Sequence, residues 1–191
     1  MPVRPWYRSR SHRRRIGQDA AAAYRAKVLA TNPIAYWPLY ETAGVTANCL
    51  VNPLQNGTYN GVTLANDPGP TGSGAAPFFD GANDSVSAFT ATFAAAFNAN
   101  LGTIMHWHKV ANVGVWTDAT NRMLYRIAAD ANNYLTFYRQ AGVDNAISCL
   151  YRSGGVNSVR SVAGLTTTDW FHLAMTWNKA DDRVRVFLDG A

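Results

Sequence analysis

Short segments of alternating apolar and polar residues dominate the chain from Ile34 onward. This alternation is typical of β-strands, because successive side chains of a strand point to opposite faces of its sheet. Between the segments lie Asn-Gly, Asp-Gly, Pro-Gly and Gly-Gly pairs, which suit tight turns. The segments are IAYWPLY (34–40), GTYNGVTL (57–64), DSVSAF (84–89), GTIMHWHKV (102–110), NRMLYRIAA (121–129), NYLTFYRQ (133–140), AISCLYRS (146–153), DWFHLAMTW (169–177) and DRVRVFLDG (182–190). This spacing predicts an all-β sandwich or jelly roll.

In the last two segments, the side chains divide clearly between the two faces of a strand. In the first of them, one face carries Phe171, Leu173, Met175 and Trp177, and the other carries Trp170, His172, Ala174 and Thr176. Because both faces are largely apolar, we expect this strand to lie in the middle of a sheet. In the second segment, Val184, Val186 and Leu188 face one way, and Arg183, Arg185 and Phe187 face the other.

A basic arm and a helix precede these strands. Residues 1–18 contain six arginines and no acidic residue. Residues 19–31 are rich in alanine, and Asp19 is suited to cap the N-terminus of a helix there. Asn32-Pro33 should end that helix, because the residue before a proline disfavours helical backbone.

The positive charge is confined to the N-terminal part of the chain. The formal net charge is +5, but residues 1–27 alone carry +7 and residues 28–191 carry −2. No apolar run approaches the roughly 18 to 20 residues that a membrane span requires, so we expect none. The two cysteines, Cys49 and Cys149, are too few for a disulfide scaffold; a single disulfide and two buried free thiols are both open.

Three partners are open for the arm: another protein, nucleic acid or a membrane surface. Arginine and aromatic residues are enriched at protein interfaces, which favours docking on a protein. Six arginines beside aromatic rings also suit contacts with phosphates and bases. The candidate docking residues are Arg4, Trp6, Tyr7, Arg8, Arg10, Arg13, Arg14 and Arg15.

The acidic residues do not favour an enzyme. Glycosidases use a pair of carboxylates, one to protonate the leaving oxygen and one to attack or to activate water. Glu41 is the only glutamate, and Asp181 and Asp182 fall in a hairpin turn where adjacent side chains point apart. We therefore expect no catalytic residues.

Two groups of residues are candidate metal ligands. Asp80, Asn83 and Asp84 offer hard oxygen ligands of the kind that calcium takes, although the same residues commonly stabilise a turn. His106 and His108 lie two apart and share a strand face, but without a third ligand we interpret them as a pair of part-buried histidines. Calcium is the one cofactor that the sequence suggests.

Aromatic residues suggest a sugar platform. The candidates are Trp107, Trp116, Trp170, Trp177, Tyr134, Phe137 and Tyr138. Large aromatic side chains also fill β-sandwich cores, which is the alternative for most of them. Trp116 lies near a loop, and we predict it to be the exposed residue that stacks on a glycan.

Five segments resemble laminin-G-like, concanavalin A-like jelly-roll domains over about residues 28–191. They are LATNPIAYWPLYETAG, NGTYNGVTL, FFDGANDSVSA, GTIMHWHKV and DWFHLAMTWNKADDRVRVFLDG, in this order. The resemblance implies an all-β, concanavalin A-like jelly-roll sandwich of two antiparallel sheets over residues 32–191, preceded by an extended basic arm (1–18) and one short helix (19–31). Domains of this family continue past the LDG turn, so we expect the last strands to follow Ala191 or to come from a neighbouring chain.

The basic leader, the helix and the AYW segment are similar to structural proteins of tailed bacteriophages, especially minor tail and capsid decoration proteins. This resemblance implies a non-enzymatic virion protein, assembled in the host cytoplasm, present in several copies and bound to other virion proteins through its arm. Its jelly roll would face outward and bind a host surface glycan. A viral coat protein whose arm binds packaged nucleic acid and a calcium-dependent lectin module are the alternatives.

Overall fold

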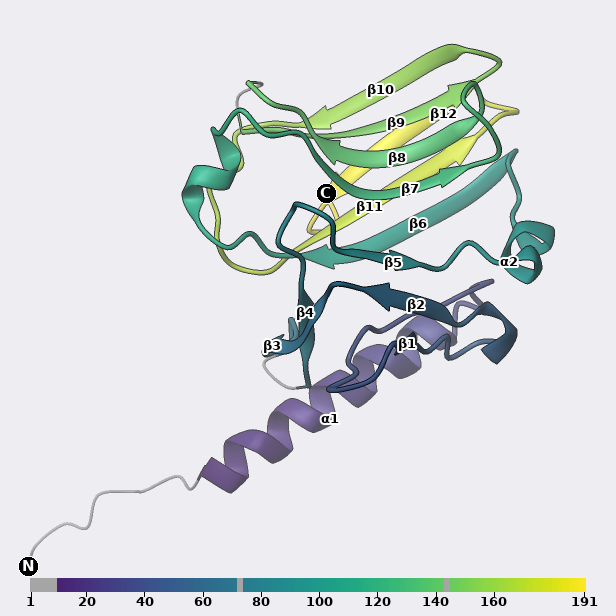
Figure 1. Ribbon diagram of the computed structural model, residues 1–191. Coiled ribbons are helices and arrows are strands. Elements are labelled where there is room, and N and C mark those ends of the chain that lie inside the picture. Colours follow the sequence, from purple (N-terminus) through teal and green to yellow (C-terminus); the bar gives the residue numbers. More distant parts are fainter. Residues whose placement is uncertain (1–9, 72–73, 143–144) are drawn as a thin grey trace, which may run out of the picture. The chain divides into compact units, whose positions relative to one another are not determined.

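Antiparallel β-sheets make up most of the structure, a computed structural model that describes residues 10–71, 74–142 and 145–191, with only the backbone for residues 10–19 (Figure 1). Every strand pair is antiparallel. The prediction of mainly antiparallel β structure is therefore confirmed. The chain divides into two compact units, one ending at Phe97 and the other beginning at Asn98, and each is described by itself.

The first helix, α1 (Arg10–Leu29), begins earlier than predicted. Arginine, glutamine and alanine are good helix formers, and no proline lies between Arg10 and Leu29 to stop the helix. Asp19 therefore lies inside α1, and its predicted capping role is wrong. The backbone from Arg10 onward is helical rather than extended, and residues 1–9 lie outside the described residues.

The C-terminus of α1 agrees with the prediction. The helix ends at Leu29, and a turn follows in which the Thr31 hydroxyl donates to the Val28 carbonyl at 2.7 Å. Asn32 has a φ of 51°, which no helix residue adopts. Asn32-Pro33 thus separates the helix from the strands, as we expected from the proline.

The rest of the first unit contains two small sheets. Its elements are β1 (Thr46–Ala47), η1 (Pro53–Gln55), β2 (Gly57–Asn60), β3 (Thr63–Asp67), β4 (Ala76–Phe78), β5 (Ser85–Ser87) and α2 (Ala91–Ala96). The strands form the sheets β1-β2-β5 and β3-β4. The predicted strand at 34–40 is wrong, because Pro38 has no N–H to pair and Leu39 has a φ of 53°. Instead, the Trp37 indole donates to the Gln55 carbonyl at 2.8 Å.

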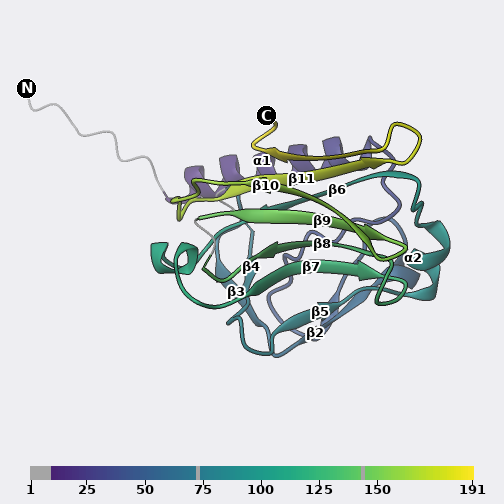
Figure 2. The same ribbon diagram turned by 90° about the horizontal axis from the view of Figure 1, so that it is seen from above.

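The second unit consists of two sheets packed face to face. Its elements are β6 (Leu101–His108), η2 (Val113–Trp116), β7 (Arg122–Ala128), β8 (Tyr134–Arg139), β9 (Ile147–Ser153), β10 (Val156–Val162), β11 (Phe171–Asn178) and β12 (Arg183–Leu188). The strand orders are β12-β11-β6 and β10-β9-β8-β7. Figure 2 shows the sheets as two layers. Strand β10 was not predicted, because its serine, asparagine and arginine residues hide its alternation.

The core of this unit lies between the two sheets. One of the two apolar faces of β11 points into this core, because Phe171, Leu173, Met175 and Trp177 are all buried, whereas the opposite face is only half-buried. This strand is also central in its sheet, as its two apolar faces predicted. From the opposite sheet, Phe137 is fully buried and lies 5.2 Å from the His106 ring, centroid to centroid.

Among the described residues, β12 pairs with β11 alone, so it forms an edge of its sheet. The predicted turn at Asp181 and Asp182 joins these two strands. A second turn follows β12, where the Asp189 carboxylate accepts the His172 N–H at 2.8 Å. None of the helices in the described part of the chain has the length and hydropathy needed to span a bilayer.

Candidate ligand-binding face

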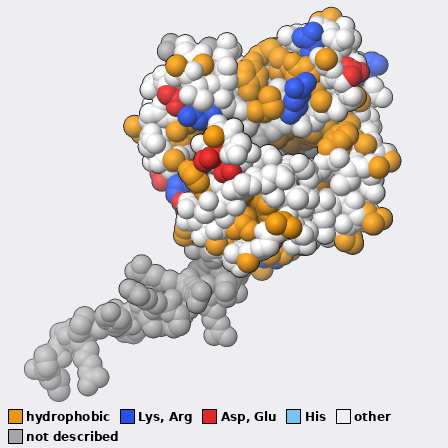
Figure 3. All heavy atoms as spheres, viewed as in Figure 1, with side chains coloured by type: hydrophobic (Ala, Val, Ile, Leu, Met, Phe, Trp, Pro, Cys, Tyr) orange, Lys and Arg blue, Asp and Glu red, His pale blue; other side chains and the backbone are white. Residues whose placement is uncertain are grey.

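The outer face of the four-stranded sheet carries aromatic, basic and hydroxyl side chains in three rows that cross β7–β10. Since Phe137 and Cys149 point into the core, the residues that alternate with them point outward. The rows are Ala128, Tyr134, Arg152 and Asn157; Arg126, Thr136, Leu150 and Val159; and Met123, Tyr138, Ser148 and Ser161. We call these residues the β7–β10 face. Figure 3, seen from the side of this sheet, shows hydrophobic and basic side chains next to one another over it.

Two arginines flank Tyr134 on this face. The Arg126 Cζ lies 4.3 Å from the centroid of the Tyr134 ring, within the range of a cation–π contact. On the other side, Arg152 is the cross-strand partner of Tyr134. Its Nη1 donates to Asn157 Oδ1 at 3.1 Å, and its Nη2 donates to Asn132 Oδ1 at 3.5 Å. Neutral groups therefore hold both guanidinium groups in place.

The second and third rows contain hydroxyl groups. The Ser148 and Ser161 hydroxyls lie 2.9 Å apart and share one hydrogen bond. The Thr136 hydroxyl donates to the Tyr125 carbonyl at 2.6 Å, and Tyr138 is half-buried beside Ser148. Thr136 and Ser148 are themselves buried, at 4% and 7% exposed. The rings of Tyr134 and Tyr138 next to amide and guanidinium groups suit a ligand with both apolar and hydrogen-bonding faces, which describes a pyranose sugar.

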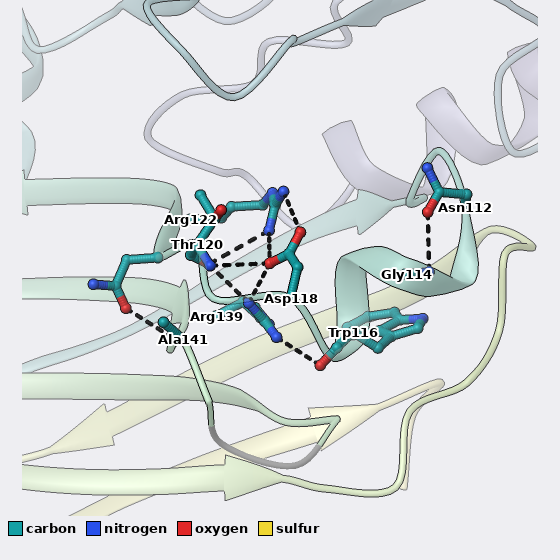
Figure 4. A network of polar contacts seen from close by, with 9 residues as sticks. Asn112, Gly114, Trp116, Asp118, Thr120, Arg122, Arg139 and Ala141 are labelled. Atoms are coloured by element: carbon teal, nitrogen blue, oxygen red, sulfur yellow. Dashed lines mark hydrogen bonds and ion pairs between the residues drawn. The ribbon is translucent and has the colours of Figure 1, made fainter.

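At one end of β7 and β8, an ion-pair network fixes the preceding loop (Figure 4). Asp118 accepts two hydrogen bonds from Arg122, at 2.6 and 2.7 Å, and one from Arg139 at 2.7 Å. Arg139 also donates to the carbonyls of Trp116 and Thr120, at 2.7 and 2.8 Å. Because Arg139 is only 2% exposed, its charge requires such compensation. The hydrogen bonds from Arg122, followed by that from the Thr120 N–H and by the charges of both arginines, lower the pKa of Asp118 to about 2.

The β7–β10 face has no such compensation. Within the described residues, neither Arg126 nor Arg152 forms an ion pair. Asp130, in the turn between β7 and β8, instead accepts hydrogen bonds from the Asn133 side chain and the Asn132 N–H. Two positive charges are thus fixed around one aromatic ring with no carboxylate paired to them.

Tyr134 and Tyr138 were among the candidates predicted from the sequence, but the two arginines beside them were not. The available signal was a Tyr-Arg dipeptide that recurs every 13 residues, ending at Arg126, Arg139 and Arg152. The three copies lie on β7, β8 and β9. Register alternation turns the first and third arginines outward and the second inward.

The prediction that Trp116 is exposed is wrong. Trp116 is only 1% exposed, its indole N–H donates to the Thr167 carbonyl at 2.9 Å, and its ring lies 5.9 Å from that of Phe171. The Asn and Gly residues of its loop are typical of an exposed segment. The hydrogen bond to Thr167 joins residues 51 apart in the sequence, so a local pattern does not predict it. A buried ring cannot stack on a sugar, so Trp116 is a core residue.

The candidate calcium ligands lie in the turn between β4 and β5. Asp80 Oδ1 accepts the Ala82 N–H at 2.8 Å, and Asp84 Oδ2 accepts the Asp80 N–H at 2.9 Å. These are the hydrogen bonds of the structural-turn alternative. Across the described ranges, no group of three or more His, Cys, Asp or Glu residues is arranged to hold a metal ion. Asn83 lies in the same turn.

The interpretation of His106 and His108 as a pair of part-buried histidines is confirmed. Their rings lie 6.2 Å apart, and both His106 ring nitrogens are buried with no hydrogen bond. Burial, together with the neighbouring histidines, lowers the pKa of His106 to about 3, and burial lowers the pKa of His108 to about 4. The alternative of free thiols is also confirmed, because Cys49 and Cys149 are both buried and unpaired with each other.

The structure describes only part of the predicted docking arm. Its first four candidate residues, Arg4, Trp6, Tyr7 and Arg8, lie outside the described residues. The other four, Arg10, Arg13, Arg14 and Arg15, belong to the first turns of α1. Docking through these residues therefore stays a prediction.

Comparisons of the chain with protein-family models, with curated proteins and with solved structures found no match.

Proposed function

We propose that this chain is a non-enzymatic structural protein of a virion, a minor tail or capsid decoration protein of a tailed phage, that docks through its N-terminal arm and displays a glycan-binding domain. Its strands would form a concanavalin A-like jelly roll. The β7–β10 face carries the proposal, because it places Tyr134 and Tyr138 among hydroxyl, amide and guanidinium groups. Such a surface suits a sugar better than it suits a catalytic reaction.

Charge segregation supports the docking half of the proposal. Residues 1–27 carry a net +7 and α1 begins within them, so the basic segment includes a stiff helical part. A helix of 20 residues is about 30 Å long. A charged helix with no acid in its first turn is suited to an acidic surface on another virion protein.

Glycan binding is tested with the full-length chain on an array of bacterial and animal polysaccharides. The variant Tyr134→Ala should weaken binding of the recognised glycans at least tenfold, because stacking on that ring is lost. The matched control Phe187→Ala removes a half-buried aromatic ring from β12 and should leave affinity unchanged. If the wild-type chain binds no polysaccharide on the array, the proposed glycan-binding function is wrong.

Docking is tested by removing residues 1–17. The shortened chain should fold and bind glycan normally but no longer join phage particles in cells that produce them. Its affinity for DNA and RNA should equal that of the full chain. If the full chain instead binds generic nucleic acid with a log–log salt slope near −5, as roughly six phosphate contacts would give, the arm is a nucleic-acid anchor and the docking proposal is wrong.

A further inference from the structure

The charge of the β7–β10 face limits the class of ligand that fits it. Every lysine and arginine after Lys27 lies in residues 98–191, so the positive charge of that part of the chain is concentrated in the unit that carries this face. On the face itself, Arg126 and Arg152 have no carboxylate partner among the described residues. A neutral ligand would leave both charges uncompensated.

The spacing of the two arginines favours a polymer with regularly placed anionic groups. Arg126 lies on β7 and Arg152 on β9, with β8 between them. Two strand spacings place the β7 and β9 backbones roughly 10 Å apart. Tyr134 lies on β8, between the strands of the two arginines: Arg126 contacts its ring and Arg152 is its cross-strand partner, so the substituents of a sugar bound beside this ring can reach both arginines.

Arginine suits this role because its planar fork can donate two parallel hydrogen bonds to a carboxylate or a sulfate. The fixed position of Arg152 adds to this, since Asn157 and Asn132 each hold one of its terminal nitrogens. Little side-chain freedom is then lost when a ligand binds. Arg126 is similarly fixed by its contact with the Tyr134 ring.

We propose that the β7–β10 face binds an acidic saccharide, with Arg126 and Arg152 pairing with its carboxylate or sulfate groups on either side of Tyr134. This inference rests on the proposed glycan-binding function and restricts its ligands to acidic saccharides. The alternative polyanion is DNA. Two unpaired arginines supply only about two phosphate contacts, which is too few for tight non-specific binding at physiological salt.

The test compares pairs of polymers that share a backbone and differ in charge. Polygalacturonate is measured against its methyl ester for carboxylate recognition, and dextran sulfate against dextran for sulfate recognition, with double-stranded DNA as the competing polyanion. The full-length chain should bind at least one acidic polymer and neither neutral one. Binding is measured by biolayer interferometry at physiological salt.

Three variants test whether the polymer binds at the β7–β10 face. Arg126→Gln and Arg152→Gln should each weaken binding of the acidic polymer about tenfold or more, since each loses charge-assisted hydrogen bonds. Arg185→Gln removes the same charge from an exposed position on β12 and should change affinity less than twofold. A circular dichroism spectrum and a thermal melt confirm that each variant is folded.

Each outcome has one meaning. Binding that follows the acidic polymer and depends on Arg126 and Arg152 supports the inference. If the neutral and acidic members of a pair bind equally, or if Arg185→Gln has the same effect as the other two variants, the inference is wrong although glycan binding stands. DNA binding that is tighter than the binding of any saccharide and is weakened by Arg126→Gln or Arg152→Gln also overturns it. If no saccharide binds here or on the wider array, the proposed function itself fails.

Discussion

Lowering the pH from 7 to 5 should destabilise the unit formed by residues 98–191, because His106 and His108 are buried in their neutral form. Burial lowers the pKa of His106 to about 3 and that of His108 to about 4. In the unfolded chain both rings titrate near 6.5. Below this value the unfolded state binds more protons than the folded state, so stability is complete above pH 6.5 and falls as the pH decreases toward the folded pKa values.

The magnitude follows from this difference in proton binding. Between pH 7 and pH 5 each unfolded imidazole changes from about one quarter protonated to almost fully protonated, whereas both folded rings stay essentially neutral. Integration gives about 1.9 kcal/mol for each histidine and roughly 4 kcal/mol for the pair. Carboxylates add little over this range, because they titrate at lower pH. Burial also lowers the pKa of His172, although the charge of Asp189 partly opposes this shift. His172 therefore adds to the loss of stability at low pH in the same direction as His106 and His108.

Urea unfolding at pH 7, 6 and 5, followed by tryptophan fluorescence, measures this effect in the full-length chain. The probes report mainly on this unit, since four of the six tryptophans lie in residues 98–191. His106→Leu removes one titrating ring and two buried nitrogens that lack hydrogen bonds. This variant should be at least as stable as the wild type at pH 7 and should lose about half of the pH dependence.

His12→Gln, which replaces the one histidine outside residues 98–191, is the control and should leave the pH dependence of this unit unchanged. A wild-type change of less than about 1 kcal/mol between pH 7 and pH 5 would refute the reasoning. So would a His106→Leu variant with the full wild-type dependence.

Three further predictions concern the same unit. Asp118→Asn should lower the melting temperature by several degrees, because buried Arg139 would lose its carboxylate, and differential scanning calorimetry measures the shift. Gly102→Ala should cost about 1–3 kcal/mol in urea unfolding, because the added methyl group would enter the space of the Trp177 ring. Cys149, fully buried and with its pKa raised to about 11 by burial, should react with Ellman's reagent at pH 8 only after denaturation.

Each of these predictions has a control or a result that contradicts it. Arg122→Gln removes the more exposed arginine of the Asp118 network and should lower the melting temperature less than Asp118→Asn does. Thr103→Ala makes a small change on the exposed side of β6 and should be nearly neutral beside Gly102→Ala. Rapid modification of Cys149 in the native chain would contradict its burial.

The strands with strong local alternation could be predicted from the sequence. In β11, apolar residues fill both faces, which predicted its central position; which of the two faces is buried depends on the opposite sheet. The segment at 34–40 looked equally apolar, yet Pro38 and Leu39 have backbone conformations that pairing does not allow. The short strands β1 and β4 and the polar strand β10 carry too little apolar pattern to be recognised without their partners.

The candidate site could be predicted only in part, because its arrangement depends on contacts between distant residues. Tyr134 and Tyr138 were recognised by residue type, but Trp116 was misplaced because its loop composition does not reveal the hydrogen bond to Thr167. Burial of Arg139 depends on Asp118, which lies 21 residues earlier. No local pattern distinguishes a buried arginine from an exposed one.

The recurring Tyr-Arg dipeptide explains why the Arg126 and Arg152 variants can lose saccharide affinity without losing stability. Its spacing and the register place Arg139 on the inner face, where a buried charge requires Asp118 and two backbone carbonyls to compensate it. Arg126 and Arg152 face outward, where neutral groups fix them and no carboxylate of the described residues pairs with them. Folding therefore depends on the charge of the inner arginine far more than on the outer two. Replacing either outer arginine by glutamine should shift the melting temperature little, so a loss of saccharide affinity in those variants would report on binding itself.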